Sequence, residues 1–124
     1  MQISHFTDLR VYQKSVESAG RIFILSKRWP AEEKYSLTDQ ARRAARSVGA
    51  NIVEAWGKRR YEAHFVSKLS DADAENHEVE HWLITAQRDG YLSGTEFDQL
   101  LEQKREVGRM LGSMMQNPRP FLLK

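Results

Sequence analysis

The spacing of hydrophobic residues predicts a chain that is helical from one end to the other. Apolar residues recur every three or four positions in four segments, and no segment shows the sustained alternation typical of strands. The predicted helices span residues 8–28, 38–57, 61–89 and 95–116. Because the links between them are short, successive helices should run antiparallel. The pattern therefore predicts an all-α fold, an up-down-up-down antiparallel four-helix bundle, in a single domain covering residues 1–124.

Three of the predicted helices carry a stripe of residues with clear core-facing spacing. In the first helix this stripe consists of Leu9, Tyr12, Val16, Ala19 and Phe23. The third helix alternates steps of four and three, the 3.5-residue repeat of left-handed bundle packing, at Phe65, Leu69, Ala72, Asn76, Val79, Leu83 and Ala86. The fourth helix has a seam of Phe97, Leu101, Lys104, Gly108, Leu111 and Met115, with Leu100, Val107 and Met114 beside it.

Small polar residues and glycines mark the predicted helix ends. Thr38 is a candidate N-cap for the second helix, and Gly57 is a candidate left-handed C-cap. Ser93 and Glu96 have the spacing of a capping box at the start of the fourth helix. The residues after Pro118 are expected to be extended.

Composition narrows the class of protein without identifying it. The 124 residues include no cysteine, which excludes disulfides and thiolate chemistry. The formal net charge is only +2, so a polyanion would have to be recognised through local charge. No signal-peptide pattern opens the chain, and the longest apolar run, residues 22–25, is far too short to span a bilayer. We therefore expect a cytoplasmic protein with no membrane partner.

Positive charge is concentrated in the second predicted helix. Residues 40–60, QARRAARSVGANIVEAWGKRR, contain six basic side chains against one acid. Trp56 and Tyr61 lie among the last of these cations, a combination that can stack bases and hold phosphates. The alternative is a helix corner with packed aromatic residues and solvated charges. The candidate contacts to RNA or DNA are Arg42, Arg46, Lys58, Arg59 and Arg60.

The third predicted helix carries the opposite charge. Within ten residues, with no Lys or Arg among them, lie Asp71, Asp73, Glu75, Glu78 and Glu80. We expect these acids to pair with arginines of the second helix, within one chain or between subunits; a cation site is the alternative. Arg43 is expected to be structural, with its guanidinium held by Glu54 or by an acid of the third helix.

The segment HEVEH, residues 77–81, matches the H-E-x-x-H pattern of zinc hydrolases. His77 and His81 would share one helix face and could bind zinc, with Glu78 activating a water. Against this hypothesis, the match is short, the helix is rich in glutamate, and Val79 inside the motif lies on the core seam. We predict no enzyme activity, no metal and no cofactor, and we keep a zinc hydrolase as the third hypothesis.

Several segments resemble the 23S rRNA intervening-sequence protein family, also called S23 or four-helix bundle proteins. The resemblance begins at FTDLRVYQKS, residues 6–15, is densest at residues 40–60 and continues through residues 78–92. The matching positions in the densest part are Gln40, Arg43, Ala44, Ser47, Asn51, Ile52 and Glu54. Val53 and Ala55 depart from the family's usual Ala and Gly, and the two histidines of HEVEH are not part of its pattern.

The resemblance implies a homo-oligomeric ring, a pentamer, with no known enzymatic activity. It supports a structural or assembly role for Arg43, Asn51 and Glu54, which match the family pattern. Because a related group acts as the accessory subunit of diversity-generating retroelements, it also implies RNA or DNA and a reverse transcriptase as partners. The alternative is a purely structural protein–protein interaction module that binds no nucleic acid.

Overall fold

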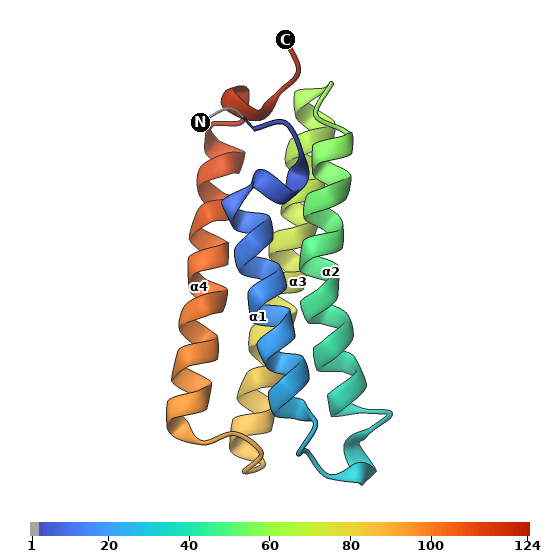
Figure 1. Cartoon of the computed structure of the whole chain (residues 1–124), viewed down its shortest axis with the longest axis vertical. Helices are drawn as coiled ribbons and strands as arrows, with labels where there is room; N and C mark the ends of the chain where they lie inside the picture. The colour runs from blue at the N-terminus through green and yellow to red at the C-terminus, as the bar shows by residue number, and fades with distance from the viewer. Residues whose placement is uncertain (1–2) are drawn as a thin grey trace.

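The computed structural model describes residues 3–124, in which four long helices account for most of the chain (Figure 1). They are α1 (Arg10–Ser26), α2 (Leu37–Gly57), α3 (Glu62–Arg88) and α4 (Gly94–Gln116). Three 3-10 turns complete the described secondary structure: η1 (Phe6–Asp8), η2 (Ala31–Glu33) and η3 (Arg119–Phe121). The predicted all-α class is confirmed, and each helix begins and ends within two residues of its predicted bounds.

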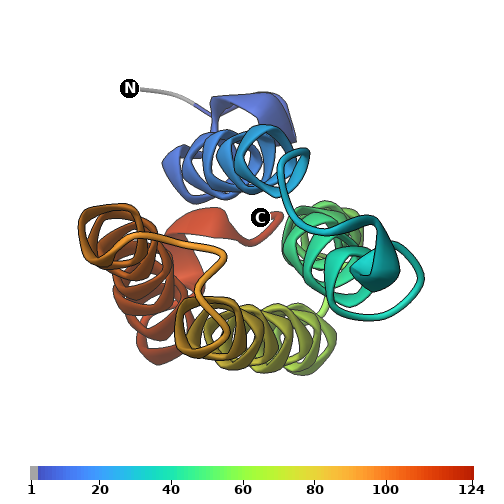
Figure 2. The ribbon, with the colours of Figure 1, turned by 90° about the horizontal axis from the view of Figure 1, so that it is seen from below.

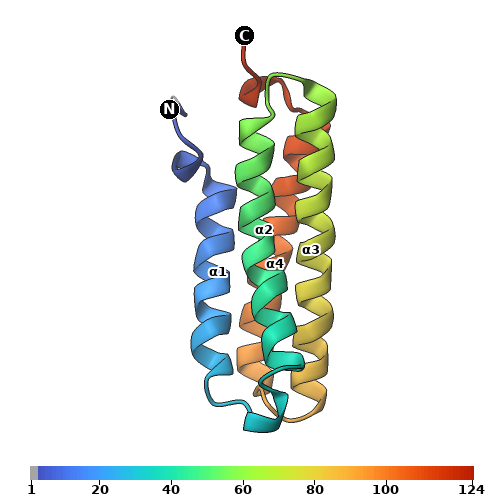
Figure 3. The same cartoon turned by 90° about the vertical axis from the view of Figure 1, so that its right-hand side faces the viewer.

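The four helices stand side by side as an antiparallel bundle. Seen along the bundle axis, α1, α2, α3 and α4 follow one another around a square, and α4 returns to lie beside α1 (Figure 2). Both ends of the described chain lie at the same end of the bundle as the α2–α3 link (Figure 3). We call this end the terminal end. In residues 3–124, no helix combines the length and the apolar character needed to cross a membrane.

Apolar side chains from all four helices fill the centre of the bundle. On α3 the structure buries all seven residues of the predicted seam, which is therefore confirmed. The buried apolar residues of α2 are Leu37, Ala41, Ala44, Ala45, Val48, Ile52 and Ala55. On α4 the core-facing stripe is Leu100, Lys104, Val107, Leu111 and Met114, which takes residues from both of the predicted rows. The rest of the predicted α4 seam, Phe97, Leu101, Gly108 and Met115, is half-buried at its edges.

The buried face of α1 differs from the prediction. It consists of Val11, Ser15, Ser18, Ile22 and Ser26, while Val16 of the predicted stripe is 48% exposed. Hydrophobic spacing selects the wrong face because three of the five buried residues are serines. Two of them satisfy their hydroxyls within the helix: Ser15 Oγ donates to a carbonyl at 2.8 Å and Ser26 Oγ at 3.0 Å.

Two predictions about helix ends are also wrong. Thr38 is buried inside the first turn of α2, and the N-cap position belongs to Ser36, whose hydroxyl donates instead to Glu33 at 2.7 Å. Gly57 is the last residue of α2 without a left-handed conformation. Within the described part of the chain, the one residue with positive φ is Gly90, at +82° after α3.

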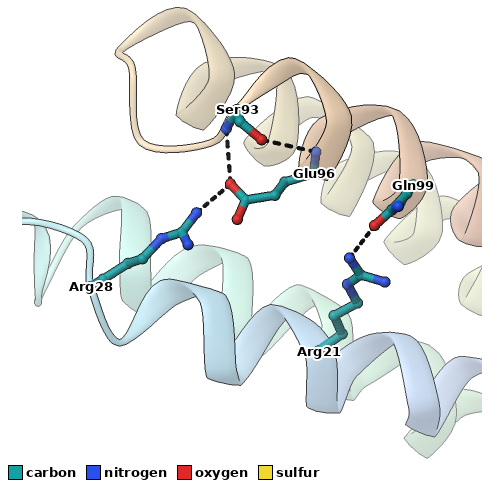
Figure 4. A network of polar contacts seen from close by, with 5 residues as sticks. All are labelled: Arg21, Arg28, Ser93, Glu96 and Gln99. Carbon is teal, nitrogen blue, oxygen red and sulfur yellow. Dashed lines mark hydrogen bonds and ion pairs between the residues drawn. The ribbon is translucent and has the colours of Figure 1, made fainter.

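A polar network ties α1 to α4 at the end of the bundle opposite the terminal end (Figure 4). The predicted capping box is present: Glu96 N donates to Ser93 Oγ at 3.1 Å, and Ser93 N donates to Glu96 Oε1 at 2.9 Å. Arg28 also pairs with Glu96, and Arg21 donates to Gln99. The Arg28 guanidinium and the Ser93 N–H lower the pKa of Glu96 to about 2, so this carboxylate stays ionised at neutral pH.

One charged side chain interrupts the core. Among residues 3–124, Lys104 of α4 is the one buried ionisable residue, at 1% exposure, and no protein group accepts a hydrogen bond from its Nζ. Asn76 of α3 donates to the Lys104 carbonyl at 2.8 Å, while its own Oδ1 has no partner in the protein. Burial lowers the pKa of Lys104 from 10.5 to about 8.

Candidate nucleic-acid interface

Three of the predicted nucleic-acid contacts form the α2–α3 corner at the terminal end. Lys58, Arg59 and Arg60 occupy the tight link after Gly57, where Lys58 N still donates to a carbonyl of the last helical turn at 3.0 Å. Tyr61 N then donates to the Lys58 carbonyl at 3.3 Å. This turn leaves Lys58 and Arg60 exposed and Arg59 half-buried.

Arg59 is held over the indole ring of Trp56. Its Cζ lies 3.8 Å from the ring centroid, and its Nη1 donates to the Trp56 carbonyl at 2.7 Å. The contact is a cation–π pair whose geometry is fixed by a backbone hydrogen bond. It presents a flat cationic and aromatic platform at the corner.

The chain after α4 folds back over this corner, whereas the prediction was an extended tail. It forms the turn η3, and Leu123 N donates to the Arg59 carbonyl at 3.3 Å. The Phe121 ring stacks on the buried ring of Phe65, with centroids 6.2 Å apart. These contacts add two exposed cations to the terminal end. We define the basic cluster as Lys58, Arg59, Arg60, Arg119 and Lys124.

The sequence prediction missed Arg119 and Lys124 because they are far from the corner along the chain. The available signal was a pair of cations around the apolar run PFLL, residues 120–123. Nothing in that run states where the tail packs. Its position depends on the stacking of Phe121 on Phe65, a contact between residues more than fifty positions apart.

The basic cluster is not neutralised by acids of its own chain. Over residues 3–124, none of its five members takes part in an ion pair. Glu54, the nearest acid along α2, pairs instead with Lys68 at 3.5 Å. The positive potential at this end is therefore available to an external anion.

A groove opens beside the basic cluster. Its volume is about 580 Å³, and we call it the tail groove. The residues that line it are Ile3, Trp56, Arg59, Pro120, Phe121, Leu122, Leu123 and Lys124. One wall is thus the Trp56–Arg59 platform, and the other is the apolar tail.

The remaining two predicted contacts lie elsewhere on α2. Arg42 Nε donates to Ser26 Oγ at 2.8 Å, and its guanidinium carbon lies 4.6 Å from the centre of the Phe23 ring. Arg46 is exposed, with its guanidinium 5.4 Å from the same ring. Twelve residues separate Arg46 from Lys58, about 18 Å along a helix. The five predicted contacts therefore do not form one surface, and Arg42 is already engaged by α1.

The predicted partner of Arg43 is wrong. Its Nε donates to Asp39, one turn earlier on α2, at 2.9 Å, and the side chain is 75% exposed. Ala41 and Ala44 face the core, so residue 43 falls on the outer side of the helix and does not reach Glu54 or α3.

Replacing Arg43 with Ala should consequently change the free energy of unfolding by no more than about 0.5 kcal/mol, the range of exposed pairs one turn apart. A chemical denaturation curve of the variant beside the wild type measures this difference. A loss of several kcal/mol would mean that Arg43 is buried by a second subunit.

Asn51 and Glu54 make local contacts. Asn51 Nδ2 donates to the Ser47 carbonyl at 2.9 Å within α2. The Glu54–Lys68 pair joins α2 to α3 with the charges reversed from the expected arrangement. Among the acids of α3, those paired within the described chain are Asp71, Asp73 and Glu80, with Lys68, His77 and Arg105. The expected pairing of α2 arginines with α3 acids inside one chain is therefore wrong.

The HEVEH segment lies on the outside of α3. His77 Nδ1 lies 2.8 Å from the Asp73 carbonyl oxygen, and His81 packs against the ring of Trp82. Val79 is buried, as its place on the seam predicts. In the part of the chain that the structure describes, no three His, Cys, Asp or Glu side chains come together in a way that could hold a metal ion.

A second surface groove lies between α1 and α2. Its volume is about 370 Å³, and we call it the α1–α2 groove. The residues around it are Tyr12, Ser15, Val16, Ala19, Gly20, Phe23, Ala45, Arg46, Gly49, Ala50 and Val53. Most of the stripe predicted to face the core from α1 thus lines an open, largely apolar groove.

The fold and these surfaces define a small all-α bundle protein with one strongly basic end. The chain belongs to the 23S rRNA-intervening sequence protein family, whose sequence profile matches residues 7–113. It is also similar to the crystal structure of a protein with unknown function from the S23 ribosomal protein family of Bacteroides thetaiotaomicron VPI-5482. That similarity has a TM-score of 0.76 and 28% identity, and covers 86% of this chain and 99% of the other. No curated protein sequence matches the chain. The predicted family is confirmed.

Proposed function

We propose that this chain is a non-catalytic scaffold that assembles into a ring and binds RNA or DNA at its terminal end. The observation that carries the proposal is the basic cluster, in which five cations gather without a counter-charge from the described chain. Phosphate backbones are bound mainly by such cations, through release of the counterions condensed on the nucleic acid.

Two features support assembly into a ring. The α1–α2 groove leaves an apolar helical stripe open, with Arg46 at its edge. On the outer side of α3, Glu75 and Glu78 have no cationic partner within residues 3–124, and partial burial together with the charge of Glu78 raises the pKa of Glu75. An interface between two different surfaces of the same chain is heterologous, and such interfaces generate closed rings when the rotation permits. The proposed number of five subunits rests on the family resemblance.

A ring would strengthen nucleic-acid binding without new contacts. Each subunit would present one basic cluster, so a strand held by one cluster meets the next at high effective concentration. This argument links the two halves of the proposal: assembly supplies avidity, and the basic cluster supplies attraction to phosphate.

Replacing Lys58, Arg59 and Arg60 together with Ala should reduce the salt dependence of binding. We expect the slope of log affinity against log salt to fall in magnitude by up to about three units, because each neutralised phosphate contributes roughly one unit. Gel shifts at a series of salt concentrations measure the slope. Melting temperature should change little, because Lys58 and Arg60 are exposed and none of the three forms an ion pair in the described chain.

The matched control removes the same charge at the other end of the bundle. Lys27, Lys34 and Arg88 are exposed there, and their replacement with Ala should change the slope by less than about one unit. Equal effects of the two triple variants would show that binding is not localised at the terminal end. If wild-type protein shifts no oligonucleotide at low salt, the alternative of a purely structural interaction module replaces the proposal.

A further inference from the structure

We infer that the tail groove receives an unpaired nucleobase, so that the terminal end selects single-stranded nucleic acid over duplex. This inference rests on the proposed nucleic-acid binding and specifies its ligand. Three observations carry it: the composition of the groove walls, their fixed position and the distribution of charge around the opening.

The walls of the tail groove suit a flat aromatic ring. Trp56 and Arg59 form one wall, with the guanidinium 3.8 Å from the indole centroid, and Leu122 and Leu123 belong to the other. Bases stack on aromatic rings and on guanidinium planes in single-strand recognition. The volume of about 580 Å³ lies within the roughly 300–1,000 Å³ typical of small-molecule sites.

The groove is formed before any ligand binds. Leu123 N donates to the Arg59 carbonyl at 3.3 Å, and Phe121 is anchored on the buried ring of Phe65. Arg59 is fixed in turn by its hydrogen bond to the Trp56 carbonyl at 2.7 Å. A ligand therefore does not have to order these walls when it binds, which favours affinity.

The charges around the groove favour a nucleic acid over another apolar ligand. Arg59 and Lys124 line the groove itself, while Lys58 and Arg60 are exposed at the same corner. A strand could place a base between the walls and its phosphates against these cations. A base within a duplex is stacked and paired, so it would have to be flipped out first. An acidic peptide satisfies the cations but lacks a base to stack on the Trp56–Arg59 platform.

The test compares single-stranded and duplex DNA of the same length on the full chain. Wild-type protein should bind an oligothymidylate of about 16 nucleotides more tightly than its duplex with oligoadenylate. Trp56→Leu should weaken single-strand binding by roughly 5- to 150-fold, the range for loss of one stacking partner, and should weaken duplex binding less than about twofold. Trp56→Phe, which keeps an aromatic face, should retain most of the single-strand affinity.

Two controls separate stacking from folding and from charge. Trp82→Leu removes a half-buried tryptophan of α3 that does not line the tail groove, and it should leave both affinities unchanged. A polyglutamate peptide of equal charge should compete poorly with oligothymidylate. Should Trp56→Leu fail to fold, wild-type protein irradiated with a 5-bromouracil oligonucleotide should cross-link to peptides that contain Trp56 or Phe121.

The outcomes distinguish this inference from the proposed function. Equal affinity for both DNA forms, with Trp56→Leu affecting neither or both alike, would overturn the inference while binding by the basic cluster stands. Competition by polyglutamate as strong as that by oligothymidylate, or cross-links confined to other peptides, would also overturn it. Absence of any binding by wild-type protein would overturn the proposed function and this inference together.

Discussion

Lys104→Met is expected to stabilise the protein by roughly 1–4 kcal/mol at pH 7, the range for replacing buried charge with apolar groups of similar size. Lys104 is 1% exposed, and no protein group in residues 3–124 accepts a hydrogen bond from its Nζ. Methionine has nearly the same length and flexibility, so the core can be refilled without a large cavity. Urea denaturation at a fixed protomer concentration measures the difference, because assembly would make stability depend on concentration.

The same lysine should give the wild type an unusual dependence on pH. Burial lowers its pKa from 10.5 to about 8 in the folded state. Below pH 8 both states hold the proton, so folding bears the full penalty of a buried charge. Between pH 8 and 10.5 the unfolded chain binds the proton more strongly, and stability therefore rises with pH. The total rise is on the order of 3 kcal/mol, from about 1.4 kcal/mol for each pKa unit.

Two variants isolate this contribution from other groups that titrate at alkaline pH. Lys104→Met should lack the rise, so the difference between wild type and variant should shrink from pH 7 to pH 10.5. Lys104→Arg keeps a charge that is not lost in this range, and it should be less stable than wild type without regaining stability at high pH. A methionine variant less stable than wild type at every pH would show that the ammonium has a favourable environment in the core.

The helical architecture could be predicted because its signal is repeated many times along the chain. The 3.5-residue seam of α3 places seven residues in the core, and all seven are buried. The face of α1 could not be predicted from hydrophobicity, since Ser15, Ser18 and Ser26 occupy its buried side. A serine that bonds its own helix is small and locally satisfied, which makes it compatible with close helix packing.

The candidate site could be predicted only where it is continuous in sequence. Lys58, Arg59 and Arg60 are consecutive, so their exposure at one corner follows from the helix end beside them. Arg42 has the same residue type but is engaged by Ser26 and Phe23 of α1, which only the tertiary structure brings near it. The tail cations join the cluster for the same kind of reason. Local patterns report on helix ends, whereas contacts between distant segments decide which cations remain free.

Replacing Ala50 with Arg is expected to convert a ring into monomers. Ala50 is an exposed residue of α2 that lines the α1–α2 groove, where small side chains keep the apolar stripe of α1 open. An arginine there would fill the groove and place a charge where another subunit should pack. Light scattering should give about five times the 14.4 kDa chain mass for wild type and one chain mass for the variant. Helix content should be unchanged, because arginine is a good helix former.

Ala63→Arg is the matched control, since Ala63 is an exposed helical alanine at the start of α3, outside the groove. It should leave the ring intact. Monomeric wild-type protein at micromolar concentration would remove the ring from the proposed function, whereas an intact ring in the Ala50 variant would move the interface away from the α1–α2 groove. If Ala50→Arg does give monomers, they should also bind long single strands more weakly than the ring. Each monomer has one basic cluster, and the avidity that comes from several linked clusters would be lost.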